Sequence, residues 1–453
     1  MKKIIYTLIL AILSLTLISC TRTTETVPEG RNEVKMWLIQ NESFDVAWWK
    51  EQVDTYNNSQ DVNYVKISWV DSGAWDTKIN SAREGGTAPD IVTYPISGVA
   101  QQAQYGTLEP LNNYISNLDT LLLDFDDKVK ANITSSEGLV YGIPRLLEPS
   151  MLMYYRKDIL SAAGWDEAPK TLDELASCAS DVTTYLQAHK ELKLSKTMQV
   201  ASNNEDYGWV SWAVQYQLSG HESSLNEDWT RANLEGYEKV CEYWADLHDM
   251  AGCAPQALTS GGYKDDYAAI LEGKVAIQQC GSWIWGTLYS LDDYSSMIDK
   301  IGVAPWPTTT GTFENEILCS LGGWSLAIER GGTNKEGAAD FIRWCLLDAE
   351  SASRLYNYFE AAHFCKVSPR KSVNDLLSSE TAGTNAMRDL LVNVLLDNSM
   401  MEPTYPWEIS QYIGNQYVAY VSDGKKASVA MKDAENEING YILANEVSKK
   451  KFN

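Results

Sequence analysis

Hydrophobic and polar positions alternate with two different periods in the first part of the chain. Residues 34–39 are a short apolar run, and residues 65–69 place apolar side chains at every second position, as strands do. Apolar residues within 49–56 and 75–82 recur at helical spacing, and residues 89–92 begin a further strand. This β-α-β-α-β order predicts a mostly parallel sheet with right-handed crossovers.

A second informative stretch covers residues 272–286. Its apolar strand, residues 275–277, leads into the small-residue turn Cys280-Gly281-Ser282, which is followed at once by Trp283 and Trp285. The glycine lets the backbone bend without a clash, and strand ends in open α/β sheets are where ligands bind. We therefore predict that Trp283 faces a ligand crevice and that Trp285 belongs to the core; the alternative is that both rings are core.

Later segments continue the mixture of strands and helices. Residues 302–307 are expected to be a strand ended by prolines, and residues 318–328 an apolar strand broken by glycines. Helical spacing predicts amphipathic helices at residues 335–347, 410–421 and 427–444. The chain is thus expected to be an α/β protein.

The N-terminus has the pattern of an export signal. Lys2-Lys3 precedes an apolar run at residues 4–18, which is too short and wrongly flanked for a stable membrane span. The ending Leu-Ile-Ser-Cys resembles a lipobox, in which Cys20 is acylated and becomes the mature N-terminus. Residues 21–31 then form a flexible tether. The alternative is a plain signal peptide with an incidental cysteine.

Composition narrows the class of partner. The net charge is −24, and it becomes −26 without residues 1–19, which hold two lysines and no acidic residue. Such acidity argues against nucleic acid as a partner. The chain has 16 Trp and 25 Tyr but 7 Phe, and rings with a flat apolar face and a hydrogen-bonding edge match a pyranose. Amphipathic aromatics also decorate many other surfaces.

Motifs for catalysis, metals or cofactors are absent from the sequence. There is no P-loop, no GxGxxG, no HExxH and no GxSxG, and no cysteine or histidine spacing typical of a metal site. Residues 323–327 lack the second elbow glycine, and residues 124–127 lack the glycine and glutamate of a calcium loop. We therefore predict a binding protein that uses neither a cofactor nor a metal and is not an enzyme.

Three blocks carry a resemblance to a known family. Residues 273–283 (GKVAIQQCGSW) resemble the most recognisable signature of the family 1 extracellular solute-binding proteins of bacterial ABC importers, whose sugar-binding branch includes maltose-binding protein. Residues 138–175, with a capping box at 171–174, and residues 335–347 are similar to two further blocks. The resemblance spans residues 33–445 and implies a two-lobed periplasmic-binding-protein type II fold, with mostly parallel sheets flanked by helices and a ligand cleft between the lobes.

The resemblance also implies a division of the chain. It assigns residues 1–19 to the signal peptide and 20–32 to the tether; lobe 1 comprises residues 33–146 plus 304–345, and lobe 2 comprises residues 147–303 plus 346–453. The strand at 302–307 is expected to return the chain to lobe 1.

Candidate ligand-binding residues follow from the family's site. Two departures from the maltose-binding branch bear on the ligand: Asn41-Glu42 replaces an acid and a lysine, and Ser97-Gly98 replaces an acid–arginine pair. Trp324 and Trp407 are added because glycines or prolines bound them. The predicted ligand-binding residues are Asn41, Glu42, Tyr94, Glu148, Glu205, Tyr207, Trp283, Trp324, Trp407 and Tyr412.

The implied function is that of a monomeric receptor, lipid-anchored outside the cytoplasm, that delivers a mono- or oligosaccharide to an ABC permease. Ligand would bridge the lobes and shift the population toward a closed state. One alternative is a receptor for a peptide or another polar solute. The other is a surface glycosidase or glycan-binding lipoprotein.

Overall fold

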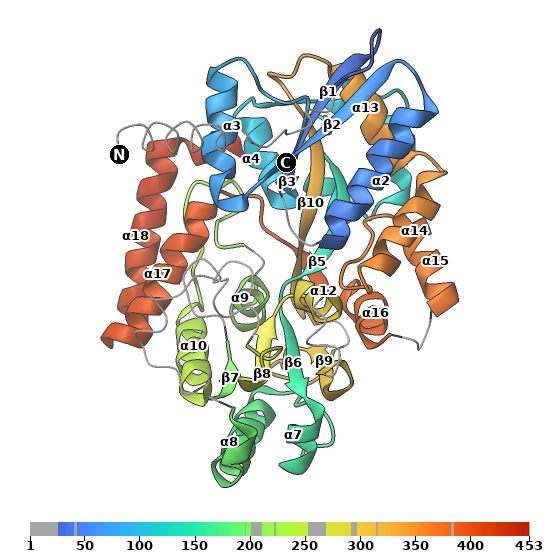
Figure 1. Cartoon of the computed structure of the whole chain (residues 1–453). Helices are drawn as coiled ribbons and strands as arrows, with labels where there is room; N and C mark the ends of the chain where they lie inside the picture. The colour runs from blue at the N-terminus through green and yellow to red at the C-terminus, as the bar shows by residue number, and fades with distance from the viewer. Residues whose placement is uncertain are drawn as a thin grey trace, which may run out of the picture.

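The computed structural model describes residues 26–39, 43–194, 196–200, 211–221, 223–251, 269–290, 297–313, 316–381 and 385–452. Their strands form two separate sheets, a seven-stranded one and a four-stranded one. In Figure 1 the larger sheet lies in the upper half of the molecule and the smaller sheet in the lower half, with helices around both. The α/β fold class predicted from the sequence is confirmed.

The larger sheet is organised around β1 and β10. Strand β1 pairs in parallel with β2 and β3, which confirms the predicted β-α-β-α-β run. Strand β10 runs antiparallel to β3, β4 and β5 and parallel to β11. The strands are β1 (Asn32–Ile39), β2 (Asn63–Val70), β3 (Ile91–Pro95), β4 (Leu108–Glu109), β5 (Ile143–Pro149), β10 (Cys319–Glu329) and β11 (Ser399–Met401).

The smaller sheet has the order β7-β8-β6-β9. Its strands are β6 (Leu152–Arg156), β7 (Lys196–Gln199), β8 (Val275–Cys280) and β9 (Ile301–Pro305). Every residue of β8 is buried, because the strand is central and covered on both faces. The predicted turn after β8 is present, and α12 (Trp283–Ser290) begins directly behind it.

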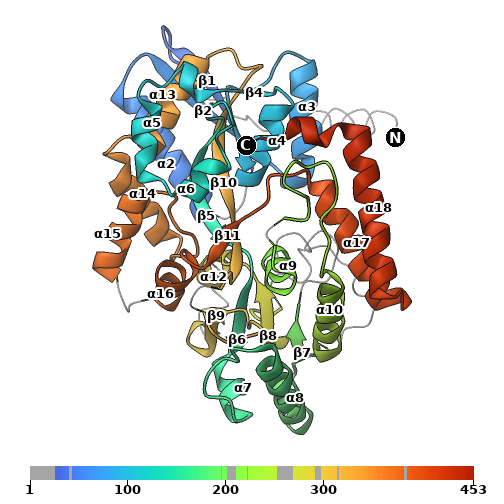
Figure 2. The same cartoon turned by 180° about the vertical axis from the view of Figure 1, so that it is seen from behind.

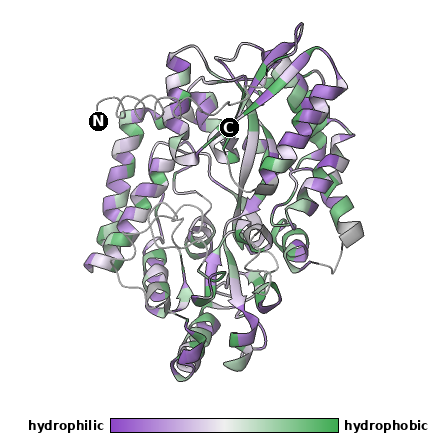
Figure 3. Cartoon of the chain, in the orientation of Figure 1, coloured by the Kyte–Doolittle hydropathy of each residue, from purple (hydrophilic) through white to green (hydrophobic). Residues whose placement is uncertain are grey.

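Helices cover both sheets and one flank of the molecule. Figures 1 and 2 show α17 and α18 packed together along that flank, next to α10. Figure 3 shows hydrophilic and hydrophobic residues mixed along these outer helices, as expected for amphipathic elements. The main helices are α2 (Ser43–Ser59), α3 (Trp75–Glu84), α4 (Ile96–Gln104), α6 (Asp127–Ala131), α7 (Lys157–Ala162), α8 (Leu172–Ala188), α9 (Trp212–Ser219), α10 (Glu238–Ala251), α13 (Lys335–Ile342), α14 (Ser351–Ala361), α15 (Lys371–Thr381), α16 (Ala386–Leu390), α17 (Trp407–Asp423) and α18 (Ala427–Asn445).

Local signals in the sequence fix several helix ends. The capping box at the start of α8 is present: the N–H of Glu174 donates to Thr171 Oγ1 at 3.0 Å, and the Glu174 carboxylate accepts from the Thr171 N–H at 3.2 Å. The helix predicted at residues 335–347 is α13 followed by a π-helical segment, Arg343–Leu347. Its extent was therefore predicted correctly, while its hydrogen-bond pattern changes midway.

Two strands differ from the predicted arrangement of the lobes. The strand expected to return to lobe 1, β9, pairs with β6 and so belongs to the smaller sheet; the chain returns to the larger sheet only at β10. Strand β11 lies in the larger sheet, although residues 346–453 were assigned to lobe 2. Both differences depend on pairing between segments far apart in the chain, which periodicity does not report. The lobe boundaries themselves stay a prediction.

Trp and Tyr contribute heavily to the core as well as to the surface. Trp49, Trp244 and Trp306 are among the largest fully buried side chains. The compositional bias therefore reflects core packing as well as any ligand site. Among the described residues, no helix has the length and apolar character needed to cross a membrane.

Candidate binding site

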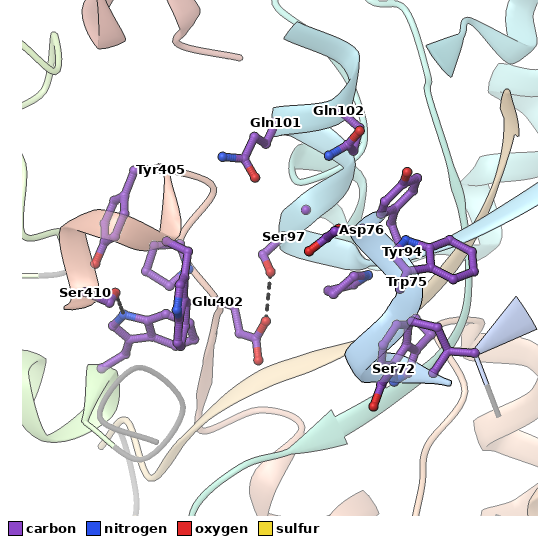
Figure 4. A pocket seen from close by; sticks show the side chains of 17 residues that line it. Ser72, Trp75, Asp76, Tyr94, Ser97, Gln101, Gln102, Glu402, Tyr405 and Ser410 are labelled. Atoms are coloured by element: carbon purple, nitrogen blue, oxygen red, sulfur yellow. Dashed lines mark hydrogen bonds between the residues drawn. The ribbon is translucent and has the colours of Figure 1, made fainter. Parts of the chain in front are cut away.

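A cavity of about 370 Å³ lies where elements of the larger sheet meet the starts of α9 and α17. This volume falls within the range of small-molecule pockets. Six of its residues are aromatic, and most of the others carry hydroxyl, amide or carboxyl groups (Figure 4). The lining residues are Ile39, Ser72, Trp75, Asp76, Tyr94, Pro95, Ser97, Gly98, Gln101, Gln102, Trp212, Trp324, Glu402, Pro403, Tyr405, Trp407 and Ser410.

One wall is built by the start of α3 and the end of β3. Trp75 and Tyr94 meet edge to face, with ring centroids 5.9 Å apart and planes at 85°. The Tyr94 hydroxyl accepts a hydrogen bond from Arg83 Nη2 at 2.9 Å, and Arg83 is itself held by Glu329 at 2.8 Å. Burial raises the pKa of Tyr94 to about 12, with Arg83 opposing the shift. Tyr94 is therefore a neutral, fixed ring.

The opposite wall comes from α9, α17 and the segment before α17. Trp212 Nε1 donates to Ser410 Oγ at 3.1 Å, and the rings of Trp212 and Trp407 meet edge to face at 5.9 Å. The hydroxyl groups of Tyr405 and Ser224 lie 3.1 Å apart, within hydrogen-bond distance. These contacts order the aromatic side chains of this wall before any ligand arrives.

Trp324 reaches the cavity from β10 because two glycines precede it. Gly323 has φ +134°, and a side chain there would overlap the backbone of β5 at Leu146. The register between β10 and β5 shifts between Trp324 and Ser325, a bulge that re-aims side chains. Gly323 is thus required for the close approach of β5, whereas a side chain at Gly322 would overlap Glu402.

Glu402 follows β11 and places a carboxyl group in the cavity wall. Its N–H donates to Leu321 O at 3.1 Å, and its carbonyl accepts from Asn132 Nδ2 at 3.0 Å. The carboxylate accepts from Ser97 Oγ at 2.9 Å, which links this segment to α4 (Figure 4). Burial raises the pKa of Glu402 to about 7; the Ser97 bond lowers it, and the charge of Glu148 raises it.

Charge in the cavity is of one sign. Asp76 and Glu402 are the acidic residues among those that line it, and the described lining residues include no lysine, arginine or histidine. Trp324 and Trp407 are half-buried, whereas the other four aromatic rings are buried. The arrangement suits an uncharged molecule with flat apolar faces and hydroxyl groups around them.

The predicted site residues fall into three groups in the structure. The cavity brings together Tyr94, Trp324 and Trp407. Trp283, Tyr412 and Glu148 do not line it. The half-buried ring of Trp283 covers Gly281, and the ring of Tyr412 meets that of Tyr441 on α18 at a centroid distance of 5.9 Å. Glu148 forms an ion pair with Lys366. Asn41, Glu42, Glu205, Tyr207 and the lipidation residue Cys20 lie outside the described residues.

Trp283 and Trp285 differ in burial as predicted. Trp285 is 5% exposed, and Trp283 is half-buried at the start of α12. The role of Trp283 in ligand binding stays a prediction, as do the roles of the other candidate residues.

Several lining residues were not among the predicted site residues. Trp212 is the last residue of a stretch, 203–212, that is rich in polar and aromatic side chains. Tyr405 lies between Pro403 and Pro406, the prolines that precede Trp407. Glu402 directly precedes Pro403, so this closely spaced pair of prolines was a usable signal. Further lining residues that were missed include Trp75, Asp76 and Ser97, each of which comes at or near the start of a helix.

A family model described as "Bacterial extracellular solute-binding protein" matches residues 51–384, well over half of the chain. The chain belongs to this family. The resemblance predicted from the three sequence blocks is therefore confirmed, and this extracellular solute-binding protein can be compared with its relatives.

Several curated relatives of this solute-binding protein are named as sugar-binding proteins. A maltotriose-binding protein of Pyrococcus abyssi is 26% identical over 295 residues, covering 64% of this chain and 58% of the relative. An arabinooligosaccharide-binding protein of Halalkalibacterium halodurans is 23% identical over 348 residues, covering 72% and 70%. A maltooligosaccharide ABC transporter solute-binding lipoprotein of Streptococcus pneumoniae is 28% identical over 170 residues, covering 37% of each. The match thus spans between 37% and 70% of the length of these relatives.

Solved structures confirm the fold class over nearly the whole chain. A maltose-bound MalE3 of T. maritima has a TM-score of 0.71 at 20% identity, covering 90% of this chain and 99% of that one. The sugar-binding protein MalE of Xanthomonas citri has a TM-score of 0.71 at 17% identity, covering 93% and 100%. The solute-binding protein therefore shares the two-lobed architecture of these proteins.

Proposed function

We propose that the solute-binding protein captures a neutral oligosaccharide in the cavity between α4 and α17 and delivers it to an ABC permease. The observation that carries this proposal is the lining of the cavity. It combines six aromatic rings with hydroxyl, amide and carboxyl groups and, among the described lining residues, no basic side chain. Rings stack on the C–H faces of a sugar, and the polar groups accept or donate at its rim.

Charge narrows the class of sugar. Asp76 and Glu402 would repel a carboxylated or phosphorylated ligand, and no lining cation among the described residues would compensate. Neutral sugars escape this penalty. The names of the relatives, which include maltotriose- and arabinooligosaccharide-binding proteins, support the same class.

Delivery would rest on closure around the ligand. The cavity walls come from elements distant in the chain, α3 and β3 on one side and α9 and α17 on the other. A sugar that touches both walls stabilises the arrangement in which they are close, and this differential affinity shifts the population. We further propose that acylation of Cys20 anchors the protein, as a monomer, outside the cytoplasm, and that it has no catalytic activity toward the sugar.

A thermal-shift panel tests the function. Maltotriose, an arabinotriose and a trigalacturonate, each added to the purified mature chain, separate neutral from anionic ligands. We expect a neutral trisaccharide to raise the Tm, since a ligand at 100 times its Kd stabilises by about 2.7 kcal/mol. Chromatography of the sugar after incubation should return it intact. A shift with trigalacturonate alone, or cleavage of the neutral sugar, would contradict the proposal.

A further inference from the structure

The backbone of Glu402, an acidic residue of the cavity, is held by hydrogen bonds from two sides. Its N–H bonds to β10 at Leu321, and its carbonyl bonds to the side chain of Asn132, which follows α6. The residue is 7% exposed. Its side chain therefore starts from a fixed point in the wall of the cavity and not from a loose loop.

The space around the carboxyl group is kept open by a glycine. Gly322 of β10 lies against it, and a Cβ at that position would overlap the carboxylate. On the other side, Ser97 Oγ of α4 donates to Oε2 at 2.9 Å. The fold thus reserves a niche for this carboxyl group and orients it with a single hydroxyl (Figure 4).

Among the described residues that line the cavity, no basic side chain accompanies this carboxyl group. Glu148 of β5 stands opposite Gly322, and Lys366 forms an ion pair with Glu148. Asp76 lines the same cavity from α3, and Tyr405 from the segment before α17. A carboxylate that is buried without a matching cation is costly, and such groups concentrate at functional sites.

We propose that Glu402 is the hydrogen-bond acceptor that selects a sugar hydroxyl in this cavity, and that sugar binding expels a proton from its carboxyl group. The proposal rests on the proposed function. The sugar hydroxyl keeps its proton and donates to the carboxylate, while the carboxyl proton passes to the solvent. A protonated carboxyl group offers fewer acceptor sites and presents a donor instead.

The consequence is an affinity that depends on pH near neutrality. Burial raises the pKa of Glu402 to about 7, so the free protein holds both forms there. If the sugar binds the ionised form, affinity rises with pH up to about 7 and then levels off. At 1.5 pH units below that value, roughly one molecule in thirty is competent, which weakens binding about thirtyfold.

Calorimetric titration at pH 5.5 and pH 8 tests the inference, with maltotriose and arabinotriose as probes on the full mature chain. We expect binding roughly thirtyfold weaker at pH 5.5 for whichever trisaccharide binds. Repeating the titration at pH 6.5 in phosphate and in Tris should give different heats, because the released proton protonates the buffer and the two buffers differ in their enthalpy of protonation. Equal affinity at both pH values, or tighter binding at pH 5.5, would overturn the inference and leave the proposed function standing. Binding of neither neutral trisaccharide would remove the proposed function and this inference together.

Glu402→Gln separates this carboxyl group from other titrating groups. The amide keeps the size of the side chain and removes its charge, so we expect at least tenfold weaker binding at pH 8 and equal affinity at both pH values. Glu51→Gln, the same change at an exposed position of α2, should keep the wild-type pH dependence. A pH dependence that persists in Glu402→Gln would show that another group causes it and would overturn the inference.

Discussion

Two buried carboxyl groups of this protein stand in contrasting surroundings. The carboxylate of Asp45, which is 1% exposed, accepts hydrogen bonds from Arg145 Nη1 at 2.8 Å and from the Tyr358 hydroxyl at 2.9 Å. The carboxylate of Glu402, which is 7% exposed, accepts a hydrogen bond from the hydroxyl of Ser97. The ion pair of Asp45 and Arg145 is buried between α2 and β5, whereas Glu402 lines a cavity.

The comparison teaches how to read a buried charge. Removing one member of a buried ion pair is costly, because the other charge is then buried without compensation, so a paired carboxylate has a role in the fold itself. Burial alone disfavours the charged guanidinium of Arg145, but Asp45 outweighs that effect and holds the pKa of Arg145 above its ordinary value. At Glu402, by contrast, no neighbouring group outweighs burial, so burial raises the pKa of this carboxyl group to about 7. The first group is structural and the second is available to a ligand.

Removal of the Arg145 guanidinium should have the largest effect on stability. Arg145→Met leaves Asp45 buried without its cation, and we expect a loss of about 3–5 kcal/mol in the free energy of unfolding. Denaturant titration of the sugar-free protein measures it. The double variant Asp45→Asn/Arg145→Met should recover part of the loss. A change below about 1 kcal/mol in the single variant would place Asp45 in the same class as Glu402.

Comparison with Glu402→Gln should show that the ionised carboxylate of Glu402 lowers the stability of the sugar-free wild type in a pH-dependent way. The pKa of Glu402 is raised from 4.5 to about 7, so the folded state binds the proton more tightly than the unfolded state does. The wild type therefore loses stability relative to the variant as pH rises from about 4.5 to about 7, by up to about 3 kcal/mol, and the difference is constant above that range. Denaturant unfolding of both proteins at pH 4.5, 6 and 8 measures it. A pH-independent difference would contradict the raised pKa.

Gly322→Ala tests the niche around Glu402 from the other side. The new methyl group would overlap the carboxylate and displace it, at a cost of about 1–3 kcal/mol in stability. Gly440→Ala in α18 is a matched control, because nothing lies within 4 Å of its added Cβ. That control should be neutral or slightly stabilising, since alanine favours helices. Equal behaviour of the two variants would show that the niche is not tight.

Ser97→Ala should have the smallest effect. It removes the hydroxyl that lowers the pKa of Glu402, so that pKa should rise further above 7. We expect about 1 kcal/mol lower stability at pH 8, where the carboxylate loses its donor. The midpoint of the pH dependence of sugar binding should move to higher pH in the same variant. A midpoint that stays in place would mean that Ser97 does not control the ionisation of Glu402.

The parts of the fold that depend on local patterns were predictable from the sequence. The alternation at residues 65–69 became β2, and the capping box at Thr171 starts α8. The turn after residue 280 and the different burial of Trp283 and Trp285 also follow from neighbouring residues. Each of these features needs only a few adjacent positions to be specified.

The remaining features depend on contacts between distant segments. Strand β9 reads like any apolar strand, and only its pairing with β6 assigns it to the smaller sheet. Glu402 is one of 61 acidic residues, and its position follows from bonds to Leu321 and Asn132. Periodicity and composition carry no information about such contacts, so the cavity was predicted only through Tyr94, Trp324 and Trp407.

The central claim is that the cavity between α4 and α17 binds a neutral sugar, and calorimetry on Trp407→Ala tests it most directly. Trp407 is a half-buried ring of the cavity. The probe is the trisaccharide that raises the Tm of the wild type. Loss of the Trp407 ring should weaken the binding free energy of this sugar by about 2 kcal/mol, which is roughly a thirtyfold loss of affinity. Trp165→Ala, which removes a half-buried ring hydrogen-bonded to Asp181 and outside the cavity lining, should bind like the wild type. Wild-type affinity in folded Trp407→Ala would contradict the claim and move the site away from this cavity.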